Sequence, residues 1–289
     1  MMSATSRRSF LRAGAITAAA ACALSSNDLS LNAEAETKSR GKIRLGVCSY
    51  SFHKFDRAHV IEFMKQLNCS RLNAKDISDH LPMRPASATD EAVAAYKAAG
   101  IELTAAGVIY FPKADEADVR EKFVYVKRAG LSLIVGSPVP EALPLVERMV
   151  KEFDMRIAIH NHGPEDKLWP SPLDVLEAVK GMDPRVGLCM DMGHTVRTGT
   201  DPVEAIRKAG KRLYDVHMKD LADLKVKESQ VAVGDGKMPV RAIFAALAGI
   251  GYAGNVDLEY EIHEDDPLPG MMRSMAFMRG MVAGMGYES

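Results

Sequence analysis

Histidine and carboxylate side chains gather in four short segments of the second half of the chain. The segments are 159–163 (Ile-His-Asn-His-Gly), 190–194 (Met-Asp-Met-Gly-His), 216–220 (Val-His-Met-Lys-Asp) and 257–261 (Asp-Leu-Glu-Tyr-Glu). Imidazole and carboxylate ligands suit Mn²⁺, Co²⁺, Fe²⁺, Zn²⁺ or Mg²⁺, and none of the four segments offers a thiolate. A lone histidine at a strand end is more often structural, so the hypothesis of a metal site rests on all four segments together.

Each of these segments ends or follows a short apolar run that is typical of a β-strand. Eight such runs alternate with eight helical patterns, which predicts eight βα units. The strands are expected at 43–48, 71–75, 102–108, 131–135, 156–161, 186–190, 213–218 and 255–260. The helices are expected at 57–67, 90–99, 116–129, 141–153, 172–180, 202–209, 240–250 and 269–283.

The eight units favour a single-domain (β/α)8 TIM barrel. Residues 157–159 are apolar in succession, as in a parallel strand that is covered on both faces. An open doubly wound sheet is the alternative, although no GxGxxG motif follows the first strand. In a barrel the carboxyl ends of all strands meet at one face, where active sites are built. Only His59, of the eight histidines, falls inside a predicted helix, and the others lie at or after strand ends.

The first 35 residues have the features of a twin-arginine signal peptide. Arg7 and Arg8 precede an apolar run at 13–24, which is too short to cross a hydrocarbon core of ~30 Å. A small-x-small cleavage site ends at Ala35. We therefore expect an exported, periplasmic or otherwise extracytoplasmic protein, with the barrel at 36–289, a length that suits one barrel of ~250 residues.

The composition excludes several classes of protein. The chain is 47% hydrophobic and 26% charged, which is ordinary for a globular domain and unlike a disordered one. It has 37 Lys and Arg against 38 Asp and Glu, so no basic excess points to nucleic acid or to a membrane surface. Cys48, Cys69 and Cys189 remain after the leader without a CxxC pair, so we expect no disulfide framework.

Three motifs resemble, in order, the signature of the xylose isomerase-like TIM-barrel superfamily. They are Asp-x-Gly-His at 191–194, Val-His-x-Lys-Asp at 216–220 and the final-strand Glu259, and the resemblance covers nearly all of 42–284. This superfamily contains sugar isomerases and epimerases, inosose dehydratases and endonuclease IV. The resemblance implies one divalent metal ion with Asp191, His217 and Glu259 as ligands, and it makes His194 a substrate-side histidine.

The chain departs from that pattern on the fifth strand, where family epimerases have Glu-Asn and this chain has His160-Asn161. His160 is then the best fourth ligand, with His162 as its rival. Glu259 is preferred to Glu261 as ligand because it matches the motif. The residues predicted to be catalytic are Glu259, His194, His162 and Lys75, and those predicted to bind substrate are Trp169, Lys219, Glu261 and His80.

Several of these assignments have structural alternatives. Lys75 and Lys219 are either substrate clamps or bases, or else lysines in rim ion pairs, with Asp76 as the partner of Lys75. Trp169 either stacks on a sugar or anchors a loop, and Glu261 either holds substrate or is a solvated carboxylate. The methionines of the last helix serve packing, or else a homo-oligomer contact.

The predicted activity is that of a metal-dependent sugar isomerase or epimerase-type enzyme, which removes a proton next to the carbonyl of a keto- or hydroxy-sugar. A dehydratase or lyase acting by β-elimination on an inosose or 3-keto-glycoside is the alternative, and a non-catalytic metal-bearing sugar-binding protein is another. An endonuclease is disfavoured by the net charge of −1 and the leader. Because a metal-bound imidazole has no free lone pair, His160 favours chemistry with a single base.

Overall fold

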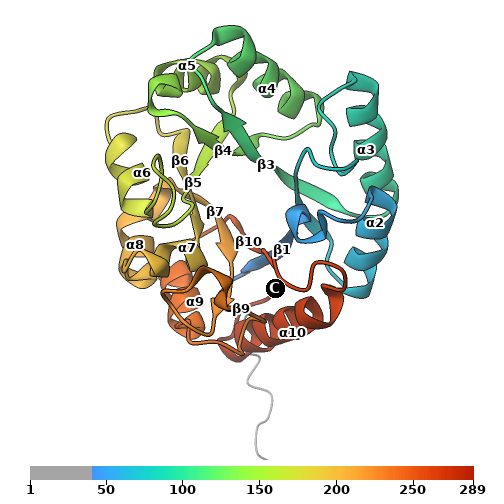
Figure 1. Cartoon of the computed structure of the whole chain (residues 1–289), viewed down its shortest axis with the longest axis vertical. Coiled ribbons are helices and arrows are strands. Elements are labelled where there is room, and N and C mark those ends of the chain that lie inside the picture. Colours follow the sequence, from blue (N-terminus) through green and yellow to red (C-terminus); the bar gives the residue numbers. More distant parts are fainter. Residues whose placement is uncertain (1–40) are drawn as a thin grey trace, which may run out of the picture. The chain divides into compact units, whose positions relative to one another are not determined.

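Eight parallel strands close into a barrel in the computed structural model, which describes residues 41–289 (Figure 1). The order around the barrel is β1-β10-β7-β6-β5-β4-β3-β2, and β10 pairs with β1 to close it. The predicted (β/α)8 TIM barrel is therefore confirmed. The barrel strands are β1 (Arg44–Cys48), β2 (Arg71–Ala74), β3 (Glu102–Phe111), β4 (Leu133–Pro138), β5 (Arg156–His160), β6 (Val186–Asp191), β7 (Leu213–Met218) and β10 (Asn255–Leu258).

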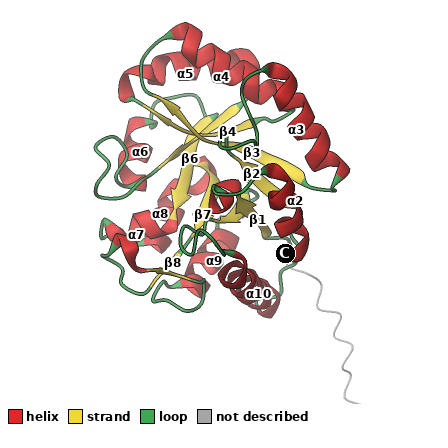
Figure 2. Cartoon of the chain, turned by 45° about the vertical axis from the view of Figure 1, so that its right-hand side comes forward, coloured by secondary structure: helices red, strands yellow, loops and turns green. Residues whose placement is uncertain are grey.

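Helices form the outer layer around the strands (Figures 1 and 2). Each has an apolar face that packs on the barrel, as Val146, Met149 and Val150 do in α5. The helices within the described residues are α2 (Arg57–Gln66), α3 (Ala86–Ala98), α4 (Glu116–Arg128), α5 (Leu143–Phe153), α6 (Pro172–Ala178), α7 (Met192–Arg197), α8 (Pro202–Ala209), α9 (Val240–Gly249) and α10 (Leu268–Gly284).

Side-chain caps fix where several of these helices begin. Ser171 accepts from the N–H of Leu173 and forms a capping box with Asp174 at the start of α6. Asp201 accepts from two N–H groups at the start of α8, where Pro202 is the first helical residue. These two helix starts lie where the sequence predicts them.

Two barrel strands extend further than the sequence pattern predicts. β3 continues past Val108 to Phe111, and β4 continues past Val135 to Pro138. The two extensions pair with each other, with Tyr110 opposite Ser137. The extension of β4 contains Gly136 and Pro138, which are typical of turns. It is a strand because β3 pairs with it, and the local sequence of β4 alone does not predict this pairing.

Short elements above the barrel also depart from the prediction. A helix, α7, begins directly after β6, so His194 as well as His59 lies in a helix, and the sequence pattern does not predict α7. After β7, the strands β8 (Asp220–Leu221) and β9 (Gln230–Val231) form a small antiparallel hairpin. Short 3₁₀ turns are η1 (Ser49–Phe52), η2 (Pro140–Ala142), η3 (Gly210–Arg212) and η4 (Lys227–Ser229).

The predicted signal peptide at 1–35 lies outside the described residues. Within 41–289, no helix is both long and apolar enough to cross a membrane. Cys48, Cys69 and Cys189 are free thiols buried in this part of the chain.

Candidate metal centre and active site

Four side chains predicted to be metal ligands converge at the carboxyl ends of the barrel strands. One donor atom from each lies within 4.8 Å of the other three, and the residues are His160, Asp191, His217 and Glu259. His217 Nδ1 is 3.1 Å from His160 Nε2 and 3.1 Å from Glu259 Oε2. His160 Nε2 is also 3.7 Å from Asp191 Oδ2. The barrel thus brings two imidazoles and two carboxylates to one buried place.

The strand ends and their register explain this convergence. His160 is the last residue of β5, and Asp191 is the last residue of β6. Asp191 pairs with His217 across β6 and β7, and His217 pairs with Asp257 across β7 and β10. Glu259 follows directly after β10, two residues beyond Asp257. Because side chains alternate along a strand, Asp257 and Glu259 share one face, and both are buried in the barrel.

This donor set fits a divalent metal ion. Oδ2 of Asp191 is buried and makes no hydrogen bond, and its contact with the Lys219 ammonium at 3.0 Å is an ion pair only. Nδ1 of His217 faces both a second imidazole nitrogen and a carboxylate oxygen, an arrangement that suits lone pairs directed at a shared cation.

The charge states of His160 and Glu259 fit that role directly. Burial lowers the pKa of His160 well below its usual value, and the neighbouring His162 lowers it further, so the ring is in the neutral, ligating form. Burial by itself raises the pKa of Glu259, but Lys219 and His217 hold that pKa well below its ordinary value. Glu259 is therefore a carboxylate at neutral pH and a weak proton acceptor.

Asp191 and His217, in contrast, have raised pKa values. Burial raises the pKa of Asp191. Burial by itself lowers the pKa of His217, but its neighbours Cys189, Cys48 and Glu259 raise it well above its usual value. Metal binding would therefore displace protons from these two groups.

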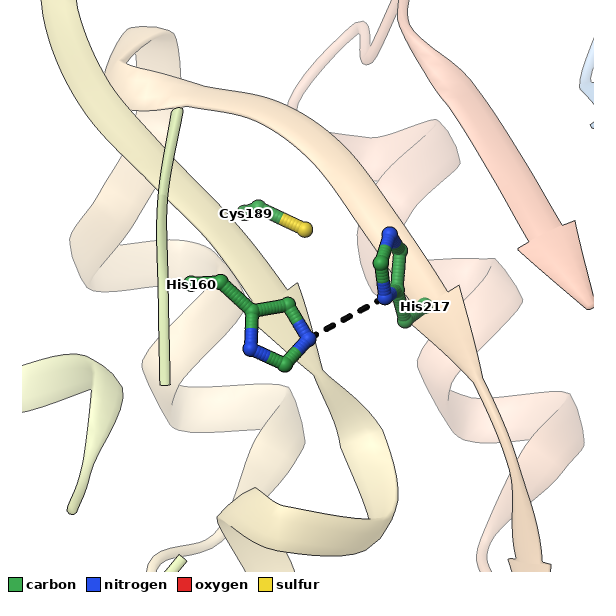
Figure 3. Close-up of side chains that lie close together, drawn as sticks. All are labelled: His160, Cys189 and His217. Atoms are coloured by element: carbon green, nitrogen blue, oxygen red, sulfur yellow. Dashed lines mark hydrogen bonds between the residues drawn. The ribbon is translucent and has the colours of Figure 1, made fainter. Parts of the chain in front are cut away.

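Cys189 also lies beside His160 and His217, as Figure 3 shows. Its sulfur forms a second potential ligand group with the two imidazoles. Burial raises the pKa of this thiol to about 12, however, and only the thiolate binds metals well. The nitrogen and oxygen donors are thus the better set for a metal ion.

Lys219 lies at the centre of the carboxylate groups. Its Nζ is 3.0 Å from Asp191 Oδ2 and 3.0 Å from Glu259 Oε2, and it also pairs with Glu261. Burial alone would lower the pKa of Lys219, but the three carboxylates, Asp191 foremost, raise it well above its ordinary value. Lys219 is therefore a permanent cation, and of its two predicted functional roles the geometry suits a clamp rather than a base. The Glu261 carboxylate is held by this lysine and is not a free solvated group.

A water-accessible cavity of about 400 Å³ opens beside Lys219. Such a volume accommodates a small molecule. The residues that matter for its chemistry are Tyr50, His53, His194, Arg197, Lys219 and Glu261. The cavity therefore contains His194, Lys219 and Glu261 of the predicted site, and Lys219 connects its wall to the carboxylates of the metal cluster.

His162 and His194 flank the metal cluster on consecutive segments. The ring of His162 is 4.5 Å from that of His160, and its Nδ1 is 3.5 Å from Asp166 Oδ2. Burial lowers the pKa of His162. Burial also lowers the pKa of His194, and the cation of Lys219 contributes, bringing it to about 3. Both rings are neutral at physiological pH, and only His160 joins the ligand group.

Lys75 lies between two aromatic rings. Its Nζ is 5.0 Å from the ring centroid of Tyr50 and 5.1 Å from that of Tyr110. Within residues 41–289 the ammonium forms no ion pair, so the alternative pairing with Asp76 is not observed. Burial lowers the pKa of Lys75, an effect that Glu259 partly offsets. An unpaired amine at the barrel mouth is available to a substrate.

Trp169 and His80 are buried, and each contacts a backbone carbonyl group. Trp169 is 2% exposed, and its indole N–H donates to the carbonyl of Pro138 at 2.7 Å, which matches the loop-anchor alternative. His80 is fully buried, and its Nε2 contacts the carbonyl oxygen of Phe55 at 2.9 Å. A buried ring with a backbone partner is typical of a structural role, and the substrate-binding roles of both residues stay predictions.

Three residues near the site are not among those predicted from the sequence, namely Tyr50, Tyr110 and Arg197. Tyr110 is 53% exposed and stacks on His162, with ring centroids 6.0 Å apart. It was missed because the third strand was predicted to end before it. Arg197 contacts Nδ1 of His194 and follows it by three residues. In a helix, side chains at this spacing are neighbours, so a prediction of α7 would also have predicted the contact.

Comparison with known proteins agrees with this fold. Residues 141–281 match the model of the family described as xylose isomerase-like TIM barrel. A solved structure of the IolI protein with a bound zinc atom superimposes with a TM-score of 0.70 at 16% identity, covering 84% of this chain and 99% of that one. At that identity the likeness concerns the fold alone, a closed (β/α)8 TIM barrel.

Two curated relatives share more sequence. The rhizopine catabolism protein MocC of Rhizobium meliloti is 30% identical over 161 residues, which cover 50% of this chain and 49% of MocC. An inosose dehydratase of Clostridium botulinum is 30% identical over 129 residues, which cover 39% of this chain and 43% of that enzyme. The chain thus spans about half the length of the curated relatives it matches, or somewhat less.

Proposed function

We propose that this protein is a divalent-metal-dependent enzyme that removes a proton next to the carbonyl of a keto- or hydroxy-sugar. The observation that carries the proposal is the buried cluster of His160, Asp191, His217 and Glu259. The cavity of about 400 Å³ beside it supports a small-molecule substrate. When bound, a divalent ion would polarise the substrate carbonyl as a Lewis acid and so acidify the neighbouring C–H bond.

We assign proton abstraction to His162. Asp166 Oδ2 lies 3.5 Å from its Nδ1 without forming a hydrogen bond, and the charge of this carboxylate favours a proton on Nδ1 and a lone pair on Nε2. Glu259, the other catalytic candidate, has its pKa held low by Lys219 and His217 and is a poorer base. The proposal therefore gives proton abstraction to His162 and keeps Glu259 as a ligand.

Lys75, Lys219 and Glu261 serve substrate orientation in this proposal. The Lys75 ammonium has no carboxylate partner among residues 41–289 and so can donate to a substrate oxygen. Lys219 and Glu261 form an ion pair at the cavity wall, which offers both a donor and an acceptor to sugar hydroxyl groups. No cluster of arginines lines the cavity, which favours an unphosphorylated sugar.

Loss of water from an inosose or 3-keto-glycoside is the second candidate function. The 30% identity to an inosose dehydratase over 129 residues favours it. A single base suffices for this reaction: Nε2 of His162 takes the proton next to the carbonyl, and the electron pair expels a hydroxyl group at the next carbon. That hydroxyl takes the proton from His162 and leaves as water, which restores the base.

The test is turnover in deuterated water with metal-loaded protein of residues 36–289. The substrates are a panel of keto-sugars, 3-keto-glycosides and an inosose, with products resolved by NMR. We expect solvent deuterium at the carbon next to the carbonyl, or a dehydrated product, and neither after removal of the metal by a chelator. Metal-independent exchange, or none with any substrate, would contradict the proposal. A C3-inverted, deuterated sugar without a dehydrated product would exclude the single-base form.

We also propose export by the twin-arginine route, for which the support is the sequence of residues 1–35 alone. Replacing both Arg7 and Arg8 by Lys is expected to leave the protein in the cytoplasm with its leader uncut. Normal processing of the double variant in fractionated cells would show that another route is used.

A further inference from the structure

The ring of His194 is held between a cation and a carboxylate. Its Nδ1 lies 3.2 Å from Nη1 of Arg197, and its Nε2 lies 3.9 Å from Oδ2 of Asp191. The backbone N–H of His194 donates to the same aspartate at 2.7 Å, because Asp191 caps helix α7. The ring therefore has a fixed orientation at the edge of the cavity.

The chemistry of the guanidinium group determines where the imidazole proton lies. Arginine carries five N–H donors and no acceptor, so a ring nitrogen beside it must present a lone pair. A proton on Nδ1 of His194 would point at an N–H of Arg197, whereas Nε2 lies 3.9 Å from Oδ2 of Asp191, near enough for its charge to favour a proton there but too far for a hydrogen bond. Both neighbours therefore favour the neutral tautomer with its proton on Nε2, and this N–H remains free for another acceptor.

The contact between Arg197 and His194 is built into the fold. The Arg197 side chain is only 2% exposed and is anchored by an ion pair with Glu165. Its Nε is buried without a hydrogen-bond partner, which is an energetic cost. Gly163, at φ +88°, leaves the necessary space: a Cβ there would lie 2.9 Å from Nη1 of Arg197 and 3.2 Å from Nδ1 of His194. Burying Arg197 with an unbonded Nε costs free energy of folding, and the orientation that it gives to the His194 ring is a functional reason for that cost.

We propose that Arg197 is a positioning residue that locks His194 as the Nε2–H tautomer, and that this N–H donates a hydrogen bond to a substrate oxygen in the cavity. The substrate contact rests on the proposed function, whereas the tautomer does not. A ring with this tautomer stabilises negative charge that develops on the oxygen, but it does not carry protons to and from carbon. Proton transfer then belongs to other groups, and the proposed function gives it to His162, whose ring centroid lies 6.1 Å from that of His194.

The direct test is two-dimensional NMR of ¹⁵N-labelled imidazole rings in the metal-free and zinc-loaded protein, with His194→Gln used to assign the signals. We expect a protonated Nε2 and an unprotonated Nδ1 for His194. In Arg197→Met the Nδ1–H tautomer should become populated. Arg207→Met, which removes an exposed arginine of α8 paired with Glu204, should leave the His194 signals unchanged. A protonated Nδ1 in the wild-type protein, or an unchanged pattern in Arg197→Met, would overturn the proposal.

A second variant covers the case in which Arg197→Met fails to fold. Glu165→Gln keeps the arginine but removes its charged anchor, and Glu165 is mostly exposed, so this variant should fold. It should show a partial gain of the Nδ1–H tautomer, and an unchanged pattern would count against the proposal.

Once a substrate is known, Arg197→Met should lower kcat roughly 10- to 100-fold, the usual effect of losing a group that orients a functional side chain, with little change in KM. If no sugar is turned over but the NMR pattern holds, the proposed function fails and the tautomer assignment stands. An unchanged kcat with an altered tautomer would overturn the role toward substrate.

Discussion

His162 and His194 lie side by side above the metal cluster, with ring centroids 6.1 Å apart, yet their surroundings are opposite. Nδ1 of His162 faces the carboxylate of Asp166 at 3.5 Å, and Nδ1 of His194 faces the guanidinium of Arg197 at 3.2 Å. A carboxylate favours a proton on the adjacent nitrogen, and a guanidinium excludes one. In the proposed assignment one ring presents a lone pair at Nε2 and the other presents an N–H. The role of each histidine then follows from the partner of its second nitrogen.

The largest effect is expected for Asp191, which is a predicted metal ligand and also lies beside His194. Asp191→Ala removes a metal ligand and should abolish metal binding and lower turnover by about 10³-fold or more, because Lewis-acid stabilisation is worth several kcal/mol. Asp201→Ala is the matched control, since Asp201 likewise caps a helix but lies away from the cluster. Metal content and rate are measured for both. Full metal occupancy in Asp191→Ala would reject the assignment of the site.

The second prediction separates the two histidines. His162→Gln should lower kcat by about 10²- to 10⁴-fold, the usual contribution of a general base, while metal content stays unchanged. Asp166→Asn should lower kcat less, because it removes only the group that favours the reactive tautomer. Steady-state kinetics together with metal analysis check both variants. Equal rates for wild type and His162→Gln would transfer the base role to Lys75 or another group.

The third prediction concerns the opposite side of the barrel mouth, where Lys75 lies between Tyr50 and Tyr110. Lys75→Met should lower kcat/KM by about 10- to 100-fold, the value of a hydrogen bond from a charged donor. Lys65→Met, on the outer helix α2, is the control and should have the wild-type value. If Lys75→Met behaves like its control, the lysine serves only to pack between the two rings.

The smallest functional effect is expected for Trp169→Phe. The variant loses the hydrogen bond to the carbonyl of Pro138, which should lower the free energy of unfolding by about 1–3 kcal/mol. KM for the sugar should remain unchanged, since the indole is buried. Urea unfolding and kinetics are compared with wild type, and a raised KM at unchanged stability would restore the sugar-stacking role.

Much of the fold was predictable because strand and helix periods are local. The apolar run of β7 and the Ser171 and Asp201 caps need no tertiary information, and they lie where the sequence places them. The far end of β4 was not predictable, since Gly136 and Pro138 are strand residues only because β3 pairs with them. Likewise α7 has six residues, which is too short for a periodic pattern.

The sequence was sufficient to predict which strand ends carry the histidines and carboxylates of the candidate site. The motifs around Asp191 and His217 placed the polar groups correctly at the barrel mouth. These motifs do not predict ion pairs between residues that are far apart in the sequence, such as Lys219–Glu261 and Arg197–Glu165. Trp169 shows the same limit, since its indole is buried by a contact with β4 that no local signal announces.

In the proposed site, His160, Asp191, His217 and Glu259 bind one divalent metal ion. X-ray absorption spectroscopy of the zinc-loaded protein, together with its metal-to-protein ratio, tests this directly. We expect one ion per chain, surrounded only by nitrogen and oxygen ligands at ~2.0–2.2 Å, with imidazole scattering. A sulfur ligand at ~2.3 Å would place the ion at Cys189 instead, and no stoichiometric binding at all would contradict the proposed site outright.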